Sequence, residues 1–332
     1  MNDRLLEVRD LSVEYRVGAG WLTGGRRVRA LHEVSLDVPA GSSVGIVGES
    51  GCGKSTLARA ILALTAPTAG EICWRGWTVV HSDRARMRQM RKDLQVVFQD
   101  PLGSLDPRMT VGASVAEAME ALEGVTDKRT KCSRVAEALV EVGLDPGLSG
   151  RYPHELSGGQ CQRVAIARAT VVRPRLLICD EAVSALDVSV QAQIVNLLAE
   201  LTRRHRMALL FISHNLAVVR HLCEEVAVLY LGRIVEQATR DELFATPRHP
   251  YTRALLDAVP EPDPAVAARP RTDEPGNEAS AGTGGAGCDF APRCRFAVAQ
   301  CRDSRPALSP AGGASRVACH RWQDLAGGCG TA

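Results

Sequence analysis

Long apolar runs and aromatic side chains are scarce in this sequence of 332 residues. Only 4% of the residues are aromatic, and the strongest apolar stretches are as short as 207–212. A membrane-spanning helix needs roughly 18 to 20 apolar residues, so we expect a chain that does not itself cross a membrane. The N-terminus carries acids at Asp3 and Glu7 and lacks the apolar core of a secretory signal. We therefore expect a location in the cytoplasm.

An excess of charge of one sign is missing as well. Forty Lys and Arg against 38 Asp and Glu leave a formal net charge of +2. This balance excludes bulk attraction to nucleic acid or to anionic lipid as the main function. With 45% apolar residues, a chain of this length can bury one or two hydrophobic cores, and we expect a globular protein.

Cysteine is plentiful, but the sequence is not typical of a small secreted protein held together by disulfides. A chain of this length needs no disulfide staples, and thiols in the cytoplasm stay reduced. Six of the eleven cysteines are scattered over the first 287 residues, whereas five crowd the last 45. Between 260 and 287 the chain is rich in Pro, Gly, Ala, Ser and Thr, which favours a disordered linker. The tail after it is chemically distinct.

Apolar patterning predicts an α/β core with an antiparallel edge layer and a helical insertion. Alternation at 5–15 and 31–38 is typical of two half-buried strands. The short apolar stretch 43–47 predicts a buried strand that runs into a glycine loop and a helix. Helical spacing predicts an insertion at about 102–172. Strands of a parallel sheet are expected at 175–179, 208–212 and 226–230, and helices at 56–64, 111–122, 131–142 and 189–204.

A phosphate-binding loop is the strongest motif. Residues 48–55 read GESGCGKS and match the P-loop pattern between a predicted strand and a predicted helix. Its N–H groups can surround a β-phosphate, Lys54 can bridge the β- and γ-phosphates, and the Ser55 hydroxyl can ligate Mg²⁺. The nucleotide-binding positions expected here are Gly48, Glu49, Ser50, Gly51, Cys52, Gly53, Lys54, Ser55 and Thr56.

Two carboxylates follow an apolar strand. Asp180 and Glu181 come directly after the stretch 176–179, which places both acids at the carboxyl edge of the predicted sheet, beside the phosphate loop. Acids often only terminate strands, but the pairing with a P-loop favours catalysis. We expect Asp180 to hold Mg²⁺ through water and Glu181 to act as the general base for the attacking water.

A second anion-binding element precedes another predicted helix. Residues 156–160 read LSGGQ, in which the Ser157 hydroxyl and the N–H groups of Gly158 and Gly159 can bind an anion. One chain holds one γ-phosphate per nucleotide, so we expect this element to serve the ATP of another molecule. His214 follows a predicted strand and can donate to a γ-phosphate, although a lone histidine at a strand end is more often structural.

In order and spacing these motifs resemble the nucleotide-binding subunit of an ABC transporter, over residues 1–257. The resemblance implies an α/β P-loop NTPase cassette with a RecA-like parallel sheet, an antiparallel β edge layer and a helical subdomain. It also implies a head-to-tail dimer that sandwiches two ATP molecules with Mg²⁺. Ala182 stands where most cassettes have proline, at a turn position that leaves hydrolysis intact.

Further residue roles follow from the resemblance alone. Gln99 is expected to touch Mg²⁺ and the attacking water, and to be catalytic together with Glu181 and His214. Tyr15 resembles the aromatic residue that stacks on adenine, next to an unusual insert at 18–29. Contacts to ATP are also implied for Ser157, Gly158, Gly159, Gln160 and Asp187.

Finer features resemble the oligopeptide, dipeptide and nickel importer branch of this family. They are FQDP at 98–101, SLDPRMT at 104–110, ALDVSVQAQ at 185–193 and HPYTR at 249–253. The branch implies a C-terminal extension at 235–264, a flexible linker at 265–287 and a cysteine-rich tail at 288–322. The implied partners are a second, non-identical ATPase subunit, two membrane permeases and an extracytoplasmic solute-binding protein. The chain is then expected at the cytoplasmic face of the inner membrane, as a peripheral protein.

The leading hypothesis is an ATPase that powers import of short peptides. One alternative is a nickel or other small-solute importer of the same branch. Another is an ABC ATPase without a transporter, acting on nucleic acid or ribosomes, but such proteins carry coiled coils, zinc insertions or fused cassettes. Here about 100 ordinary residues separate Lys54 from Ser157, so we expect no nucleic-acid partner. A regulatory module without ATPase activity is disfavoured because Lys54, Asp180, Glu181 and His214 are all present.

The cysteine-rich tail suits a metal centre. Cys288, Cys294, Cys301 and Cys319 could hold an iron–sulfur cluster or a structural zinc, and unliganded thiols are the third alternative. Their spacing is wider than in common zinc sites, and related peptide-importer ATPases with a similar tail are thought to bind a [4Fe-4S] cluster, which we therefore favour. We expect a structural role, because the linker would otherwise leave the tail too mobile to dock.

Overall fold

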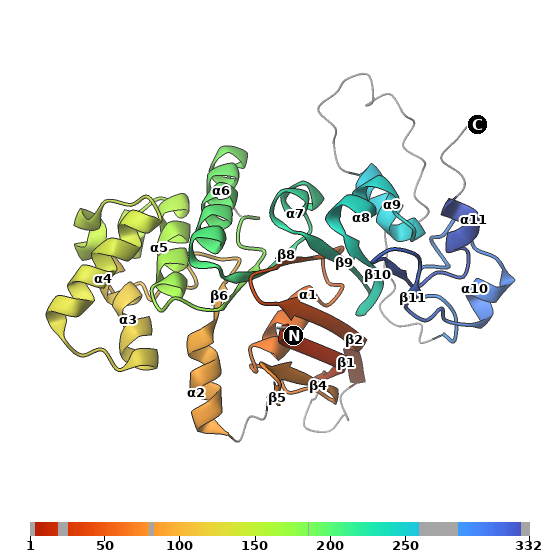
Figure 1. Cartoon of the computed structure of the whole chain (residues 1–332), viewed down its shortest axis with the longest axis horizontal. Helices are drawn as coiled ribbons and strands as arrows, with labels where there is room; N and C mark the ends of the chain where they lie inside the picture. Colours follow the sequence, from red (N-terminus) through yellow and green to blue (C-terminus); the bar gives the residue numbers. More distant parts are fainter. Residues whose placement is uncertain (1–3, 19–25, 80–82, 185, 259–284, 327–332) are drawn as a thin grey trace.

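The computed structural model describes residues 4–18, 26–79, 83–184, 186–258 and 285–326 (Figure 1). Most of the expected linker at 265–287, part of the insert at 18–29, and Cys329 lie outside these residues. None of the helices in the described ranges is long and apolar enough to cross a bilayer.

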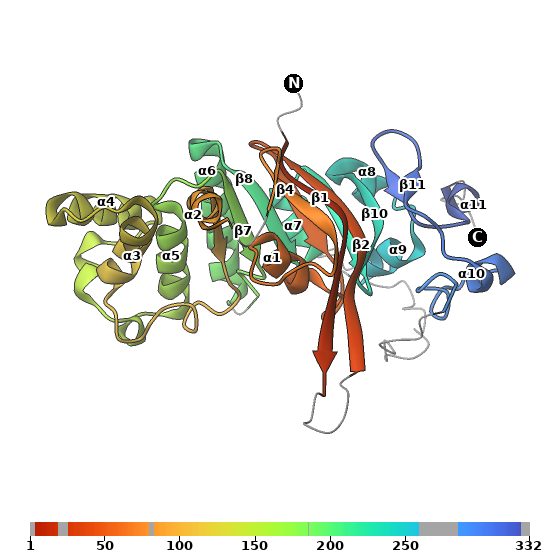
Figure 2. The same cartoon turned by 90° about the horizontal axis from the view of Figure 1, so that it is seen from below.

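The expected antiparallel edge layer is present as a four-stranded sheet with the order β2-β1-β4-β5. Figure 2 shows β1 and β2 as a long two-stranded ribbon that crosses the core sheet. The strands are β1 (Arg4–Val17), β2 (Arg26–Pro39), β4 (Ala69–Trp74) and β5 (Trp77–Thr78). In β1, Leu6 and Val8 are buried two residues apart, as the period-two pattern predicts, but the consecutive residues 11–13 are all buried, where the pairing with β2 is irregular.

The core sheet has eight strands in the order β11-β12-β10-β9-β3-β8-β7-β6. Its parallel part is β6 (Leu94–Val97), β7 (Leu176–Asp180), β8 (Ala208–Ser213), β3 (Ser43–Val47) and β9 (Glu225–Tyr230). Both faces are covered, so β7 and β8 are buried at every residue. Leu209 and Phe211 of β8 face one hydrophobic cluster, and Leu210 and Ile212 face the other, beneath the edge layer.

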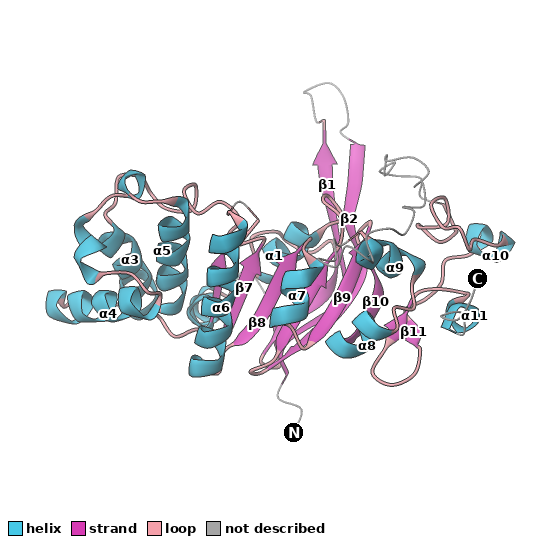
Figure 3. Ribbon diagram, turned by 90° about the horizontal axis from the view of Figure 1, so that it is seen from above, coloured by secondary structure: helices cyan, strands magenta, loops and turns pink. Residues whose placement is uncertain are grey.

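The helices cover the core sheet and form a subdomain beside it (Figure 3). Around the sheet lie α1 (Lys54–Ile61), α2 (Arg84–Asp93), α6 (Val188–His205) and α7 (Leu216–Leu222). The subdomain contains α3 (Val111–Glu123), α4 (Lys128–Glu141), η1 (Pro146–Gly150), η2 (Pro153–Glu155) and α5 (Gly158–Thr170). Val111, Val115 and Met119 form the buried stripe of α3, and the Thr110 hydroxyl caps this helix.

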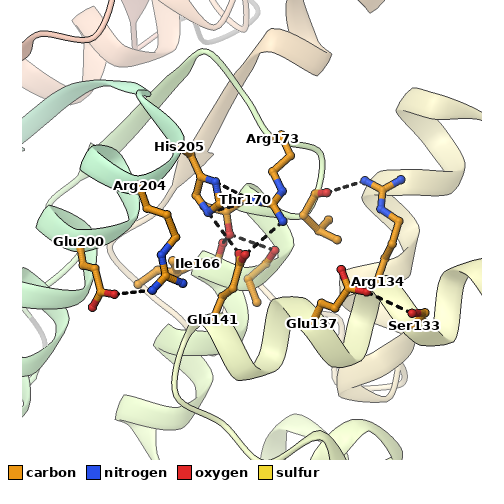
Figure 4. Close-up of polar contacts among 12 residues, drawn as sticks. Ser133, Arg134, Glu137, Glu141, Ile166, Thr170, Arg173, Glu200, Arg204 and His205 are labelled. Atoms are coloured by element: carbon orange, nitrogen blue, oxygen red, sulfur yellow. Dashed lines mark hydrogen bonds and ion pairs between the residues drawn. The ribbon is translucent and has the colours of Figure 1, made fainter.

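Polar contacts join this subdomain to α6 (Figure 4). Glu141, at the end of α4, lies 3.1 Å from Arg173 Nη2 and 3.3 Å from His205 Nε2. Arg134 of α4 donates to the carbonyl of Val171 at 2.6 Å. These contacts tie α4 to the segment between α5 and β7 and to the end of α6.

The tail packs directly on the core, which corrects the expectation that it could not dock by itself. Strand β12 (Arg316–Val317) pairs antiparallel with β10 (Arg233–Thr239), and β11 (Ser309–Pro310) pairs with β12. The remaining helices on this side are α8 (Arg240–Ala245), α9 (Pro250–Asp257), α10 (Ala299–Asp303) and α11 (Trp322–Ala326). The ring of Phe290 lies 5.4 Å from that of Tyr230, so apolar packing also fixes the start of the tail.

Candidate active site

The phosphate-binding loop runs from the end of β3 to the start of α1. Helix α1 begins at Lys54, after Gly53, whose φ of 109° lies in the left-handed region. A Cβ on Gly48 would lie 2.2 Å from the carbonyl oxygen of Leu229, and one on Gly53 would lie 2.6 Å from that of Ala30. Only glycine fits at these two positions, so the loop is packed tightly against the backbone of β9 and β2.

Lys54 is buried beneath the loop, with 4% of its surface exposed. Its Nζ donates to the carbonyls of Gly48 and Glu49 at 2.8 and 2.9 Å. The same nitrogen lies 3.6 Å from Oε1 of Glu181. The ammonium group therefore stands between the loop and the end of β7, where phosphate oxygens can replace the two carbonyls.

Ser55 and Asp180 form the pair that fits a divalent cation. The Ser55 hydroxyl donates to Oδ1 of Asp180 at 3.1 Å. Burial raises the pKa of Asp180, the hydrogen bond from Ser55 opposes this shift, and the nearby Glu181 reinforces it. A hydroxyl and a carboxylate are hard oxygen ligands of the kind Mg²⁺ prefers, and a cation here would stabilise the ionised carboxylate.

Glu181 is held between two groups that can bind phosphate. Its carboxylate Oε1 lies 3.6 Å from Lys54 Nζ and 3.6 Å from Nδ1 of His214, which follows β8. The Glu181 backbone has a φ of 50°, unusual for a residue with a side chain, and its N–H donates to the Ile212 carbonyl at 2.9 Å. The structure thus brings Lys54, Glu181 and His214 together, next to the pair of Ser55 and Asp180.

Gln99 and Tyr15 come from two different sheets, Gln99 after β6 of the core sheet and Tyr15 in β1 of the edge layer. Gln99 is exposed and follows β6, which pairs in parallel with β7, so it lies at the same sheet edge as Glu181. The Tyr15 hydroxyl lies 3.5 Å from the Thr56 hydroxyl, which joins β1 to the first turn of α1. The roles of Gln99 and Tyr15 toward nucleotide stay predictions.

The LSGGQ element opens α5, on the other side of α6 from α1 in Figures 1 and 3. Gln160 N–H donates to the Ser157 hydroxyl at 3.3 Å, and Ser157 N–H donates to the Gln160 amide oxygen at 2.9 Å, which is a capping box. A Cβ on Gly159 would lie 2.7 Å from Val190 of α6. Ser157, Gly158 and Asp187, which precedes α6, are exposed and accessible to another molecule.

The tail cysteines converge, yet they do not form a recognisable metal site. Cys288, Cys294, Cys301 and Cys319 line one small cavity, and every cysteine in the described ranges is free of disulfides. Burial raises the pKa of Cys319 to about 11. Within the described part of the chain, no group of three or more His, Cys, Asp or Glu side chains is arranged to hold a metal ion. The expected cluster therefore stays a prediction.

Two residues that the sequence analysis did not assign to the site contact the phosphate loop. The Tyr251 hydroxyl accepts the N–H of Glu49 at 2.9 Å, and Arg293 pairs with the Glu49 carboxylate at 3.0 Å. The HPYTR segment indicated the importer branch and not a contact with the loop, since Tyr251 lies 202 residues from Glu49 along the chain. No local pattern reports a contact across that separation.

Comparison with protein families and curated proteins gives matches along most of the chain. Residues 31–184 match the family described as ABC transporter, and residues 235–301 match the oligopeptide/dipeptide transporter C-terminal region. The chain is 48% identical over 323 residues to a probable peptide ABC transporter ATP-binding protein, y4tS, of Sinorhizobium fredii, covering 96% of this chain and 90% of that protein. It is 45% identical over 308 residues to the oligopeptide transport ATP-binding protein OppF of Salmonella typhimurium, covering 92% of each.

Solved structures show the same fold. The structure of cbiO1 from Clostridium perfringens, part of the ABC transporter complex cbiONQ, has a TM-score of 0.62 at 29% identity, covering 73% of this chain and 91% of that one. The ATP-binding cassette MJ0796, solved as a dimer in a post-hydrolysis state with ADP and phosphate, has a TM-score of 0.63 at 28% identity, covering 71% of this chain and 98% of that one.

Proposed function

Because the chain belongs to the ATP-binding subunits of the ABC transporter family, we propose that it hydrolyses ATP to power the import of short peptides through a separate permease. The identity to peptide-transport ATPases along nearly the whole chain carries this proposal, since it includes the C-terminal region as well as the cassette. It favours peptides over nickel or another small solute as the cargo.

In the proposed reaction Glu181 acts on the attacking water. The water oxygen bonds to the γ-phosphorus, its proton passes to the Glu181 carboxylate, and the bond from the γ-phosphorus to the bridging oxygen breaks. The products are ADP and inorganic phosphate. Ser55 and Asp180 would hold Mg²⁺, which when bound offsets the charge of the phosphates. Lys54 binds the β- and γ-phosphates, and His214 donates to a γ-phosphate oxygen.

Phosphate release tests this proposal. The full chain, co-expressed with its permeases and partner subunit, is expected to release phosphate from ATP, and Lys54→Ala is expected to bind ATP too weakly to do so. Lys128→Ala, which removes an exposed cation at the start of α4, is the matched control and should behave as wild type. A wild-type assembly that releases no phosphate from ATP would refute the proposed activity.

The partners follow from the exposure of the LSGGQ element. Ser157 and Gly158 are exposed, and the helix α5 that they open lies on the other side of α6 from α1 (Figure 1), so we infer that they bind the nucleotide held by another ATPase subunit. The SLDPRMT segment favours a non-identical partner. Two permeases and an extracytoplasmic binding protein complete the proposed importer, with this chain peripheral on the cytoplasmic face of the inner membrane.

For the tail we infer a [4Fe-4S] cluster held by Cys288, Cys294, Cys301 and Cys319. These four thiols line one small cavity, and their spacing in the sequence is wider than in common zinc sites, which favours a cluster over zinc. When bound, the cluster would link four segments of the tail. Anaerobically purified protein should contain iron and sulfide in near-equal amounts and absorb near ~400 nm, with the band lost in Cys294→Ser. Colourless protein with stoichiometric zinc would overturn this assignment.

A further inference from the structure

An arginine of the cysteine-rich tail contacts the phosphate-binding loop. Nη1 and Nη2 of Arg293 each lie 3.0 Å from a different carboxylate oxygen of Glu49, which is a bidentate ion pair. The side chains are 17% and 37% exposed, so the pair is partly shielded from solvent. The hydrogen bonds to Glu49 raise the pKa of Arg293. Such paired, charge-assisted bonds fix geometry as well as contributing free energy.

Tyr251 makes a second contact to the same loop residue. It lies in the first turn of α9, where Pro250 sets the backbone and His249 Nδ1 accepts the Tyr251 N–H at 3.0 Å. The Tyr251 side chain is fully buried, with its ring 4.5 Å from that of Tyr230. Its hydroxyl, fixed by this packing, accepts the N–H of Glu49 at 2.9 Å.

Glu49 also binds the side chain of Lys54 through its backbone carbonyl. The Glu49 carbonyl accepts from Lys54 Nζ at 2.9 Å, and the neighbouring Gly48 carbonyl accepts at 2.8 Å. The side chain and N–H of Glu49 are therefore bound from outside the loop, by the C-terminal region. Its carbonyl is bound from inside, by the lysine expected to meet the phosphates.

We propose that Arg293 and Tyr251 are positioning residues that hold the phosphate-binding loop in its nucleotide-binding shape, so that the C-terminal tail sets the affinity for ATP. This inference rests on the proposed function. Neither residue reaches the reacting atoms, since both act on Glu49 at the start of the loop. Losing them should weaken binding of the ground state and transition state alike, which raises KM for ATP and leaves kcat nearly unchanged.

A double-mutant cycle on the ion pair tests this directly. ATP is titrated calorimetrically into the full-length protein, in EDTA to prevent hydrolysis, for wild type, Arg293→Gln, Glu49→Gln and the double variant. Each single variant should weaken ATP binding roughly fivefold, and the double variant should be no weaker than either. The ATP affinity of Arg293→Lys should fall between those of wild type and Arg293→Gln, because lysine keeps the charge but cannot form the bidentate pair. Arg295→Gln, at an exposed site on the same segment, should bind as wild type.

Hydrogen exchange and kinetics separate loop positioning from anchoring of the tail. Arg293→Gln and Tyr251→Phe should both speed exchange of the Glu49 amide, and both should raise KM for ATP more than they lower kcat. Unchanged ATP affinity in Arg293→Gln and Glu49→Gln, with faster exchange confined to residues 285–303, would show that the pair anchors only the tail and would overturn the inference. A wild-type protein that fails to bind ATP would instead refute the proposed function.

Discussion

Glu181 illustrates how the proposed chemistry depends on one residue's backbone. A residue with a side chain at φ of 50° costs about 1 to 3 kcal/mol, and the bond from its N–H to Ile212 helps to hold it there. In this conformation the carboxylate points between Lys54 and His214, at the place where a γ-phosphate is expected.

Replacing Glu181 by glutamine should stop hydrolysis without stopping binding. The amide keeps the shape of the side chain but cannot accept the proton of the attacking water, so phosphate release should fall by ~10² or more. Calorimetric ATP titration should give an affinity near that of wild type. Glu200→Gln, on the exposed face of α6, serves as the control. Phosphate release by Glu181→Gln at the wild-type rate would remove Glu181 from the role of base.

At the residue scale the sequence predicted that the residues of the P-loop and of the end of β7 lie together, because these motifs are local. Strand ends and a glycine loop place Lys54, Ser55, Asp180 and Glu181 with little freedom. The contacts of Arg293 and Tyr251 with Glu49 could not be predicted, since they depend on how a distant segment packs on the core. The nucleotide roles of Gln99, Tyr15 and the LSGGQ residues stay predictions.

Among the elements, the short apolar strands were predicted within about one residue, because strands buried on both faces consist of continuous apolar runs. Helix α1 begins at Lys54, two residues before the expected start at 56, since the helix follows directly on the left-handed Gly53. Strands β11 and β12 were not predicted, because two residues are too few to show an apolar pattern. The docking of the tail was mispredicted for a related reason, as its pairing with β10 is nonlocal.

The contact between α4 and α6 should make stability depend on pH. Burial lowers the pKa of His205. The nearby Arg173 lowers it as well, because its guanidinium has only hydrogen-bond donors and its Nη1 lies 2.6 Å from His205 Nδ1. Glu141 opposes this shift and Arg204 adds to it. Below about pH 6.5 the unfolded chain takes up a proton that the folded chain resists. The contribution of His205 to the free energy of unfolding should therefore be largest above about pH 6.5. It should fall as the pH drops toward the lowered pKa of His205 in the folded chain.

Urea unfolding at about pH 7.5 and about pH 5.5 measures this effect. In His205→Gln the loss of stability on acidification should be smaller than in wild type, because the titrating ring is gone. His221→Gln, at an exposed position of α7, should keep the wild-type loss. An equal loss in wild type and His205→Gln would show that the acid sensitivity arises elsewhere.

At the scale of the whole molecule, the ABC cassette fold expected from the sequence is confirmed by solved ATPase cassettes that superimpose on most of this chain. One chain places its phosphate loop and its LSGGQ element on opposite sides of α6 (Figure 1). We therefore expect that ATP bound to the loop is covered by the LSGGQ element of a second subunit, which stays a prediction for this chain.

The second subunit is expected to be a different chain. The SLDPRMT segment resembles one of two non-identical ATPases, so an affinity-tagged form of this protein, extracted with its permeases, should carry one further ABC ATPase in a one-to-one ratio. Native mass spectrometry of the purified assembly measures that ratio. An assembly that contains this chain as its only ATPase would show a homodimer.

Peptide uptake by reconstituted vesicles shows whether ATP hydrolysis at Glu181 powers peptide import. Vesicles hold the permeases, the partner subunit and this chain, with ATP enclosed and the binding protein and a labelled short peptide outside. The account predicts that wild-type vesicles accumulate peptide and consume ATP together, whereas Glu181→Gln vesicles of equal protein content do neither above background. Uptake that persists undiminished in Glu181→Gln, or wild-type vesicles that hydrolyse ATP without moving any peptide, would contradict it.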